Sequence, residues 1–197
     1  MCGLKFLVNG REIASVSSDG RNIINAYISG DVIGSELATA HMTGGYYGSE
    51  EDTSHRIWLG HHIIVEHDEI EVQFLNDVSS SSGGMTIEEL ADVHANDYEP
   101  DEVGEENIHE WLASQPKVRK CFSFEFMGPN NERINSTTSE NDHTFHFGVM
   151  WKWTNPNEVS VRLSSTTLEN MRQKKAGTTH LNLKILSGQS VKLRVSS

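Results

Sequence analysis

The sequence lacks the short motifs that mark several large enzyme classes. It contains no Gly-Lys-Ser/Thr phosphate-binding loop, no Gly-x-Gly-x-x-Gly dinucleotide motif and no Gly-x-Ser-x-Gly nucleophile motif. It also contains no His-Glu-x-x-His and no Cys-x-x-Cys pair. No motif therefore indicates a cofactor or a catalytic residue, although a site assembled from distant residues stays open.

Long apolar runs and cysteine-rich segments are missing as well. No apolar run reaches the roughly 18 residues that a membrane-spanning helix needs. The first ten residues, MCGLKFLVNG, do not contain the long apolar core of a secretory signal. The two cysteines, Cys2 and Cys121, are expected to be reduced thiols. Together these features predict a cytoplasmic protein that does not contact a membrane.

Basic residues are almost absent from the middle of the chain. Residues 50–110 contain eighteen acidic side chains and one basic side chain, Arg56, which gives a net charge of −17. Residues 1–49 have a net charge of −1 and residues 111–197 one of +6, within a total of −12. A field of one sign can steer an oppositely charged partner toward the protein. The total charge opposes direct nucleic-acid binding by the basic C-terminal region.

Alternating apolar residues predict strands on both sides of this acidic middle. Residues 57–65 and 70–74 are rich in β-branched and aromatic side chains, which predicts a hairpin closed by His67 and Asp68. Strand alternation would place His61 on the apolar face of that hairpin, where it would need a hydrogen-bond partner. The four histidines of residues 55–67 would then point in at least three directions. Because a metal needs three or four converging ligands, no metal site is predicted here.

Three more hairpins are expected from turn chemistry. Asn9-Gly10 is a strong two-residue turn signal between two strands, and residues 155–157 and 187–189 would form three-residue loops. The register is argued from matching apolar residues across each pair. The expected partners are Trp153 with Val159, Trp151 with Val161 and Val149 with Leu163 in one hairpin, and Leu181 with Val195, Leu183 with Leu193 and Ile185 with Val191 in the other, which would set Lys184 opposite Lys192.

Short helices and loops are expected between the β-rich parts. Thr86 and Glu89 form a capping box that predicts a helix over residues 87–95. A second helix would start near Ile108 and end before Pro116, and a third would cover residues 167–175. Residues 35–42 fit either a helix or a strand. The exposed pair Tyr46-Tyr47 would contact a partner or cover a sheet edge.

The predicted fold class is therefore α+β. It is mainly antiparallel β, in hairpin-rich sheets or a sandwich, with two or three short amphipathic helices. The expected organisation is a β-rich unit over 1–78, a Ser/Gly linker or mobile loop over 79–84, an acidic helical segment over 85–115 and a β-rich unit over 116–197. The two β-rich units would be separate or form one composite domain.

The charge layout favours an acidic binding protein that docks to or neutralises a basic protein, as inhibitors and immunity proteins of nucleic-acid-acting toxins do. Such a complex would be tight and sensitive to salt. Alternatively, the acidic segment would dock on the basic C-terminal face of its own chain. Two other functions stay open: an enzyme with a site assembled from dispersed His and Asp/Glu, with or without a metal, and an assembly subunit that uses β-edge pairing. The residues expected to bind the partner are Glu50, Glu51, Asp52, Glu66, Asp68, Glu69, Asp97, Glu99, Asp101, Glu102, Glu105 and Glu106.

Overall fold

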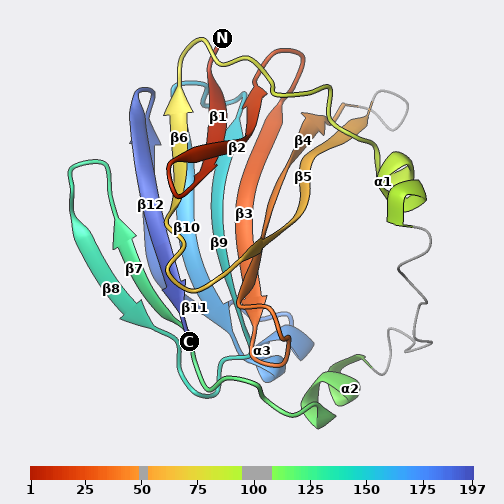
Figure 1. The fold of residues 1–197 in the computed structure, drawn as a ribbon, viewed down its shortest axis with the longest axis vertical. Coiled ribbons are helices and arrows are strands. Elements are labelled where there is room, and N and C mark those ends of the chain that lie inside the picture. The colour runs from red at the N-terminus through yellow and green to blue at the C-terminus, as the bar shows by residue number, and fades with distance from the viewer. Residues whose placement is uncertain (49–52, 95–107) are drawn as a thin grey trace.

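The computed structural model describes residues 1–48, 53–94 and 108–197, and it shows two six-stranded antiparallel sheets packed face to face (Figure 1). Sheet A contains, in spatial order, β2 (Arg11–Ser17), β1 (Gly3–Val8), β6 (Ile70–Leu75), β12 (Gln189–Ser196), β7 (Ser123–Met127) and β8 (Arg133–Thr137). Sheet B contains β11 (Thr178–Leu186), β10 (Glu158–Thr166), β9 (Thr144–Lys152), β3 (Ile23–Asp31), β4 (Ala38–Tyr46) and β5 (Ser54–Ile64). The predicted fold class is confirmed.

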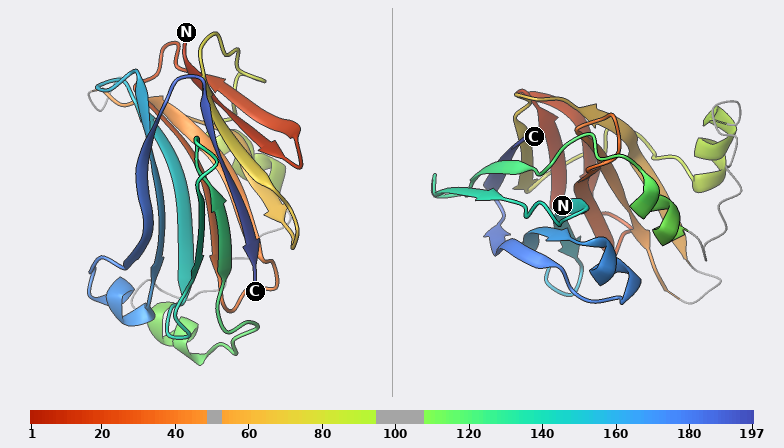
Figure 2. Two further views of the ribbon diagram at one scale, coloured as in Figure 1. Left: turned by 90° about the vertical axis from the view of Figure 1, so that its left-hand side faces the viewer. Right: turned by 90° about the horizontal axis from the view of Figure 1, so that it is seen from below.

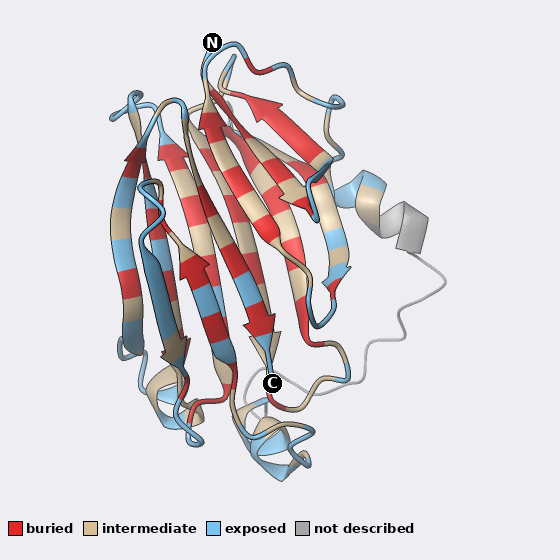
Figure 3. Ribbon diagram, turned by 60° about the vertical axis from the view of Figure 1, so that its left-hand side comes forward, coloured by how far each residue is buried: buried red, intermediate tan, exposed pale blue. Residues whose placement is uncertain are grey.

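Most strands alternate between buried and more exposed residues, as the colour bands in Figure 3 show. The buried residues of each sheet face the other sheet, so the core lies between the two layers. In β6, for example, Ile70, Val72 and Phe74 are buried, as the sequence predicts. Both sheets combine strands from residues 1–78 with strands from residues 116–197, since β12 pairs with β6 and β9 pairs with β3. Their inward side chains share one hydrophobic core.

The N-terminal hairpin forms as its turn chemistry predicts. Strands β1 and β2 pair across Asn9 and Gly10, and both turn residues have positive φ values, of 53° and 77°. Two consecutive residues with positive φ are what a type I′ turn requires, and Asn-Gly satisfies this at low cost. The sequence fits either a helix or a strand over residues 35–42. In the structure residues 38–46 form strand β4.

The hairpin predicted for residues 57–74 is wrong. Strand β5 pairs with β4 in sheet B, whereas β6 pairs with β1 and β12 in sheet A, so the chain crosses between the sheets near His67. The pairing of β4 with β5 also shifts register twice. As a result Trp58 and Ile64 are buried, while His61 lies on the outer face with its side chain 53% exposed. The placement of His61 on an apolar face was therefore wrong too.

The two C-terminal hairpin predictions have different outcomes. Strands β9 and β10 do form a hairpin, but Val159 pairs with Trp151, which is two residues from the predicted partner. Because a shift of two residues preserves the facing of side chains, the other residues of the predicted apolar face are buried. Trp153 is the exception: it lies beyond the end of β9 and is 63% exposed. The second hairpin does not form, because β11 pairs with β10 in sheet B and β12 with β6 and β7 in sheet A.

Three short helices lie outside the sandwich. They are α1 (Ile87–His94), α2 (Ile108–Ser114) and α3 (Leu168–Arg172), and α2 lies beside α3 at one end of the sheets (Figure 2). The capping box of α1 is present, with Glu89 N donating to Thr86 Oγ1 at 3.1 Å and Thr86 N donating to the Glu89 carboxylate at 2.7 Å. Neither α2 nor α3 has a buried residue. Among the described residues, no helix has the length and apolar character needed to cross a membrane.

The Ser/Gly segment over residues 79–84, expected to be a linker or mobile loop, is hydrogen bonded along β2. Ser81 N donates to Ser15 O at 2.9 Å, and Ser17 N donates to Ser80 Oγ at 3.0 Å. The indole Nε1 of Trp58 donates to Ser82 O at 3.1 Å. These bonds occupy backbone groups that the edge strand β2 would otherwise present to solvent.

Candidate functional site

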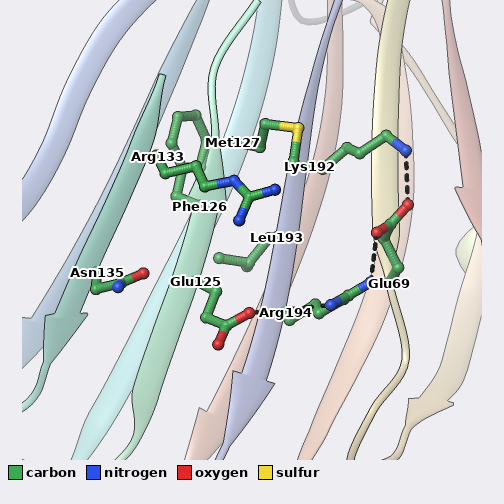
Figure 4. A pocket seen from close by; sticks show the side chains of 9 residues that line it. All are labelled: Glu69, Glu125, Phe126, Met127, Arg133, Asn135, Lys192, Leu193 and Arg194. Carbon is green, nitrogen blue, oxygen red and sulfur yellow. Dashed lines mark hydrogen bonds and ion pairs between the residues drawn. The ribbon is translucent and has the colours of Figure 1, made fainter. Parts of the chain in front are cut away.

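The predicted acidic residue Glu69 lies in a pocket of about 340 Å³ on the outer face of sheet A (Figure 4). Its carboxylate accepts hydrogen bonds from Lys192 Nζ at 2.6 Å and from Arg194 at 2.8 Å, both on β12. Lys192 also lies 3.7 Å from Glu71 and Arg194 lies 4.0 Å from Glu125. On this part of the outer face of sheet A, the basic and acidic side chains are therefore paired with one another.

This pairing changes the protonation of Glu69. The hydrogen bond from Lys192 is the main cause that lowers the pKa of Glu69 below the ordinary carboxyl value of 4.5, and the charges of Lys192 and Arg194 add to it while burial opposes it. The same contact raises the pKa of Lys192. Glu69 is therefore ionised at neutral pH and is neutralised within its own chain.

The other predicted acidic residues fall into two groups. Asp68 accepts from Asn9 Nδ2 at 2.7 Å and from Val65 N at 3.0 Å, and Glu66 accepts from Ser197 N at 3.4 Å. The remaining members of the set lie outside the described residues: Glu50, Glu51, Asp52, Asp97, Glu99, Asp101, Glu102, Glu105 and Glu106.

Replacing Glu69 with glutamine should lower the free energy of unfolding by about 1 kcal/mol at pH 7, because Lys192 and Arg194 lose a shared anion but remain partly solvated. A lowered folded-state pKa stabilises the fold above pH 4.5, and that stabilisation is lost as the pH falls through the folded pKa. Urea denaturation of both proteins between pH 7 and about pH 3 should therefore show the difference shrinking below pH 4.5. Glu125→Gln is the control, because Glu125 is 72% exposed. A difference that persists unchanged in acid contradicts this account.

The outer face of sheet B has a different chemistry, because imidazole and phenol rings gather there. Tyr27 on β3 stacks on His41 of β4, with ring centroids 4.8 Å apart and planes inclined by 14°. His146 of β9 lies 5.4 Å from Tyr27 on its other side, and His61 of β5 meets His41 edge to face at 6.0 Å. We call Tyr27, His41, His61 and His146 the ring surface. Four strands contribute one ring each, and all four rings are at least partly exposed.

Register explains how these rings come together. Tyr27 pairs with His41 on one side and with Gly148 on the other, so the three residues form one row across β4, β3 and β9. The absence of a Cβ at Gly148 lets the His146 ring lie close to the backbone there: an added Cβ would lie 3.0 Å from His146 Nε2 and 3.9 Å from Asn25 Oδ1. Asn25 Oδ1 is buried and has no hydrogen-bond partner in the described structure. The His146 ring therefore occupies the space that a larger residue at position 148 would need.

Burial keeps two of these imidazoles uncharged. It is the main cause that lowers the pKa of His41 below 6.5, and the neighbouring His61 lowers it further. Burial also lowers the pKa of His146, and the charge of Arg162 adds to the effect. Burial raises the pKa of Tyr27. At neutral pH the two imidazoles and the phenol are neutral groups that can both donate and accept hydrogen bonds.

A pocket of about 440 Å³ adjoins the ring surface where β3 ends and β9 begins. Its lining includes His146 together with the hydroxyl residues Ser29 and Thr39 and the carboxylate of Glu36. Glu36 also contacts His61, with Oε2 3.2 Å from Nε2. His41 Nε2 lies 3.2 Å from Thr39 Oγ1. The ring surface and this pocket together form one polar, ring-lined candidate binding site, with two carboxylates, those of Asp31 and Glu36, in the pocket lining.

No group of three or more His, Cys, Asp or Glu side chains converges as metal ligands within the described residues. The histidines of the ring surface face one another through their ring faces and edges rather than through nitrogen atoms aimed at one point. Their arrangement is that of a contact surface and not of a coordination shell.

Comparison of the chain with protein-family models, curated proteins and solved structures found no match in any of the three.

Sequence reasoning missed the ring surface, although part of its signal was present. Outward positions of residues 25–29 and 39–43 alternate with buried apolar ones, which singles out Tyr27 and His41 as neighbours if those strands pair. His146 joins them only through the pairing of β3 with β9, which are more than a hundred residues apart in sequence. His61 joins them only because β5 belongs to sheet B.

Proposed function

We propose that the protein is a binding protein whose recognition surface is the outer face of sheet B, and that its ligand is a neutral saccharide. The observation that carries the proposal is the ring surface: Tyr27 with His41, His61 and His146, supplied by four strands and left partly exposed. Rings packed against one another on a rigid sheet are held in position and lose little conformational entropy when they contact a ligand.

The chemistry around the rings favours a hydroxyl-rich ligand. Tyr27 is flanked by His41 and His146, so its ring holds the two imidazoles in place, and the exposed rings of His61 and His146 are left to contact the C–H groups of a sugar. Ser29 and Thr39, which line the adjoining pocket, supply hydroxyl groups for the sugar hydroxyls, and the imidazoles of His41 and His146 stay neutral. Rings combined with a few polar groups of fixed position are the usual composition of a small-molecule site.

The proposal is tested by isothermal titration with four neutral probes: cellohexaose, laminarihexaose, mannohexaose and chitohexaose. At least one should bind, and Tyr27→Ala should weaken that binding at least about tenfold because the central ring is lost. Tyr27→Phe keeps the ring and should retain most of the affinity. Binding of a neutral ligand should also vary little with salt.

Glu125→Gln is the matched control, because Glu125 is an exposed residue on the outer face of the opposite sheet. It should leave binding unchanged. The proposal fails if none of the four probes binds, or if Tyr27→Ala binds the same probe as tightly as the unaltered protein.

The acidic binding-protein hypothesis stays a prediction from charge. Its support is the net charge of −17 over residues 50–110, where the one basic residue, Arg56, lies 3.5 Å from Glu89. Against it, Glu69 already binds Lys192 and Arg194 and is not a free charge for a basic partner. The ring surface is therefore the better supported recognition surface.

A further inference from the structure

A chain of four hydrogen-bonded side chains crosses the seam where an edge of sheet A meets an edge of sheet B. Ser136 is on β8, the last strand of sheet A, and His180 is on β11, the last strand of sheet B. Ser136 Oγ lies 2.7 Å from His180 Nδ1, and His180 Nε2 lies 2.8 Å from Ser165 Oγ. Ser165 Oγ in turn lies 2.8 Å from Asp142 Oδ2.

Counting protons fixes the direction of every bond in this chain. Ser165 has one hydroxyl proton and donates it to Asp142, an acceptor that also receives Ser139 N at 2.8 Å. The contact between Ser165 and His180 must then use the Nε2 proton. A neutral imidazole with its proton on Nε2 has a lone pair on Nδ1. Ser136 must therefore donate its hydroxyl proton to His180.

We infer that Ser136 is an activated nucleophile, with His180 as its general base, and that this seam is a site for hydrolysis of carboxylic esters. Ser165 and Asp142 are positioning residues that hold His180 in the tautomer with a free Nδ1. The arrangement performs the task of a Ser-His-Asp triad with one hydroxyl inserted between histidine and carboxylate. This inference is independent of the ring surface, since no residue is shared.

Burial and exposure suit these roles. Ser165 and Asp142 are 2% and 4% exposed, so their hydrogen bonds are shielded from competing water. Ser136 and His180 are only partly buried, so each remains in part exposed to solvent at the seam. Burial also lowers the pKa of His180, against the opposing charge of Asp142, so the base is unprotonated at neutral pH.

The backbone of β8 supplies donors for the developing oxyanion. Gly128 N donates to Glu132 O, and Thr138 N donates to Phe122 O. With the register of β7 and β8, these two bonds show that the even-numbered residues of β8 direct their backbone N–H groups toward β7. In an antiparallel ladder, alternate residues direct N–H groups away from the partner strand. The N–H groups of Asn135 and Thr137, on either side of Ser136, therefore face the open edge of sheet A. Such groups stabilise the negative oxygen formed when a carbonyl is attacked.

The reaction balances without a cofactor. Ser136 Oγ attacks the ester carbonyl carbon while its proton moves to His180 Nδ1. The carbon–oxygen bond to the alcohol breaks, and the imidazolium returns the proton to the departing alkoxide. Water, deprotonated by the same imidazole, then attacks the acyl-Ser136 and releases the acid, with the proton passing back to Ser136.

A fluorophosphonate and p-nitrophenyl acetate are suitable probes for the full-length protein. Ser136 displaces fluoride from phosphorus in the first, so intact mass and peptide mapping should show one adduct on Ser136. With the second, a burst of one nitrophenolate per protein is expected. Ser136→Ala should remove both signals, and His180→Ala should slow them about 100-fold or more. Ser123→Ala is the control, because the Ser123 hydroxyl contacts Thr137 and no histidine.

Nitrogen-15 NMR of His180 supplies a readout that does not depend on reactivity. The inference expects an unprotonated Nδ1 and a protonated Nε2 at pH 7, and Ser165→Ala should abolish this preference while circular dichroism shows an intact fold. A protonated Nδ1 overturns the inference. So does labelling of the unaltered protein at the rate seen with Ser136→Ala, which would leave the chain of bonds as a tether between the two sheet edges.

Discussion

Replacing Phe145 with alanine should lower the free energy of unfolding by about 3–5 kcal/mol. Phe145 is 1% exposed, and its ring centroid lies 4.6 Å from that of Phe122 and 5.0 Å from that of Phe124. Phe145 belongs to β9 in sheet B and Phe124 to β7 in sheet A, so this cluster joins the two layers. Removing one ring loses its transfer free energy and leaves a cavity that a rigid sandwich cannot fill.

Urea denaturation followed by tryptophan fluorescence measures this effect, since the midpoint should fall while the slope stays constant. Ile134→Ala is the control, because Ile134 is 36% exposed on the edge strand β8 and should cost less than about 1 kcal/mol. If Phe145→Ala also costs less than 1 kcal/mol, the two sheets are not held together by this cluster.

Local sequence signals predicted the elements that local chemistry determines. Asn9-Gly10 closes the first hairpin, and the capping box of Thr86 and Glu89 begins α1. Alternation in β6 and β9 identified buried residues such as Val72 and Val149. These features depend on residues close in sequence, so no knowledge of the tertiary fold is needed to find them.

Two connections were mispredicted for one physical reason. Near His67 and near Gly188 the chain passes from one sheet to the other, while the flanking apolar residues still face each other. In a hairpin those residues are neighbours within one sheet, and in a sandwich they meet across the core. Both arrangements bury the same side chains, so the pattern of apolar residues cannot distinguish them.

The candidate site could not be predicted for a related reason. The ring surface needs the pairing of β3 with β9 and the membership of β5 in sheet B, and both are non-local. The seam that contains Ser136 and His180 needs the edges of two different sheets to meet. Sequence can identify outward-facing rings and hydroxyls, but only the topology decides which of them become neighbours.

Gly45 offers the second prediction, because it lies at the most crowded contact between β4 and β5. Gly45 is buried and pairs with His55, and a Cβ added to it would lie 1.8 Å from Ser54 O and 2.9 Å from Ser54 C. Both atoms belong to the backbone, so no side chain can rotate away to make room. Gly45→Ala should therefore force β5 away from β4 and cost about 3 kcal/mol, at the upper end for an added methyl group in a packed interior.

Gly83→Ala is the matched control, since an added Cβ there meets no atom within 4 Å and its effect should stay within about 0.5 kcal/mol. Thermal and urea denaturation of the two variants measure the difference. The displacement in Gly45→Ala also has a local consequence, because β5 carries His61 and β4 carries His41. The edge-to-face contact between these rings should loosen, and imidazole NMR signals of His41 and His61 should shift in Gly45→Ala but not in Gly83→Ala. If both variants are equally stable, strands β4 and β5 are not packed as closely at Gly45 as their register requires.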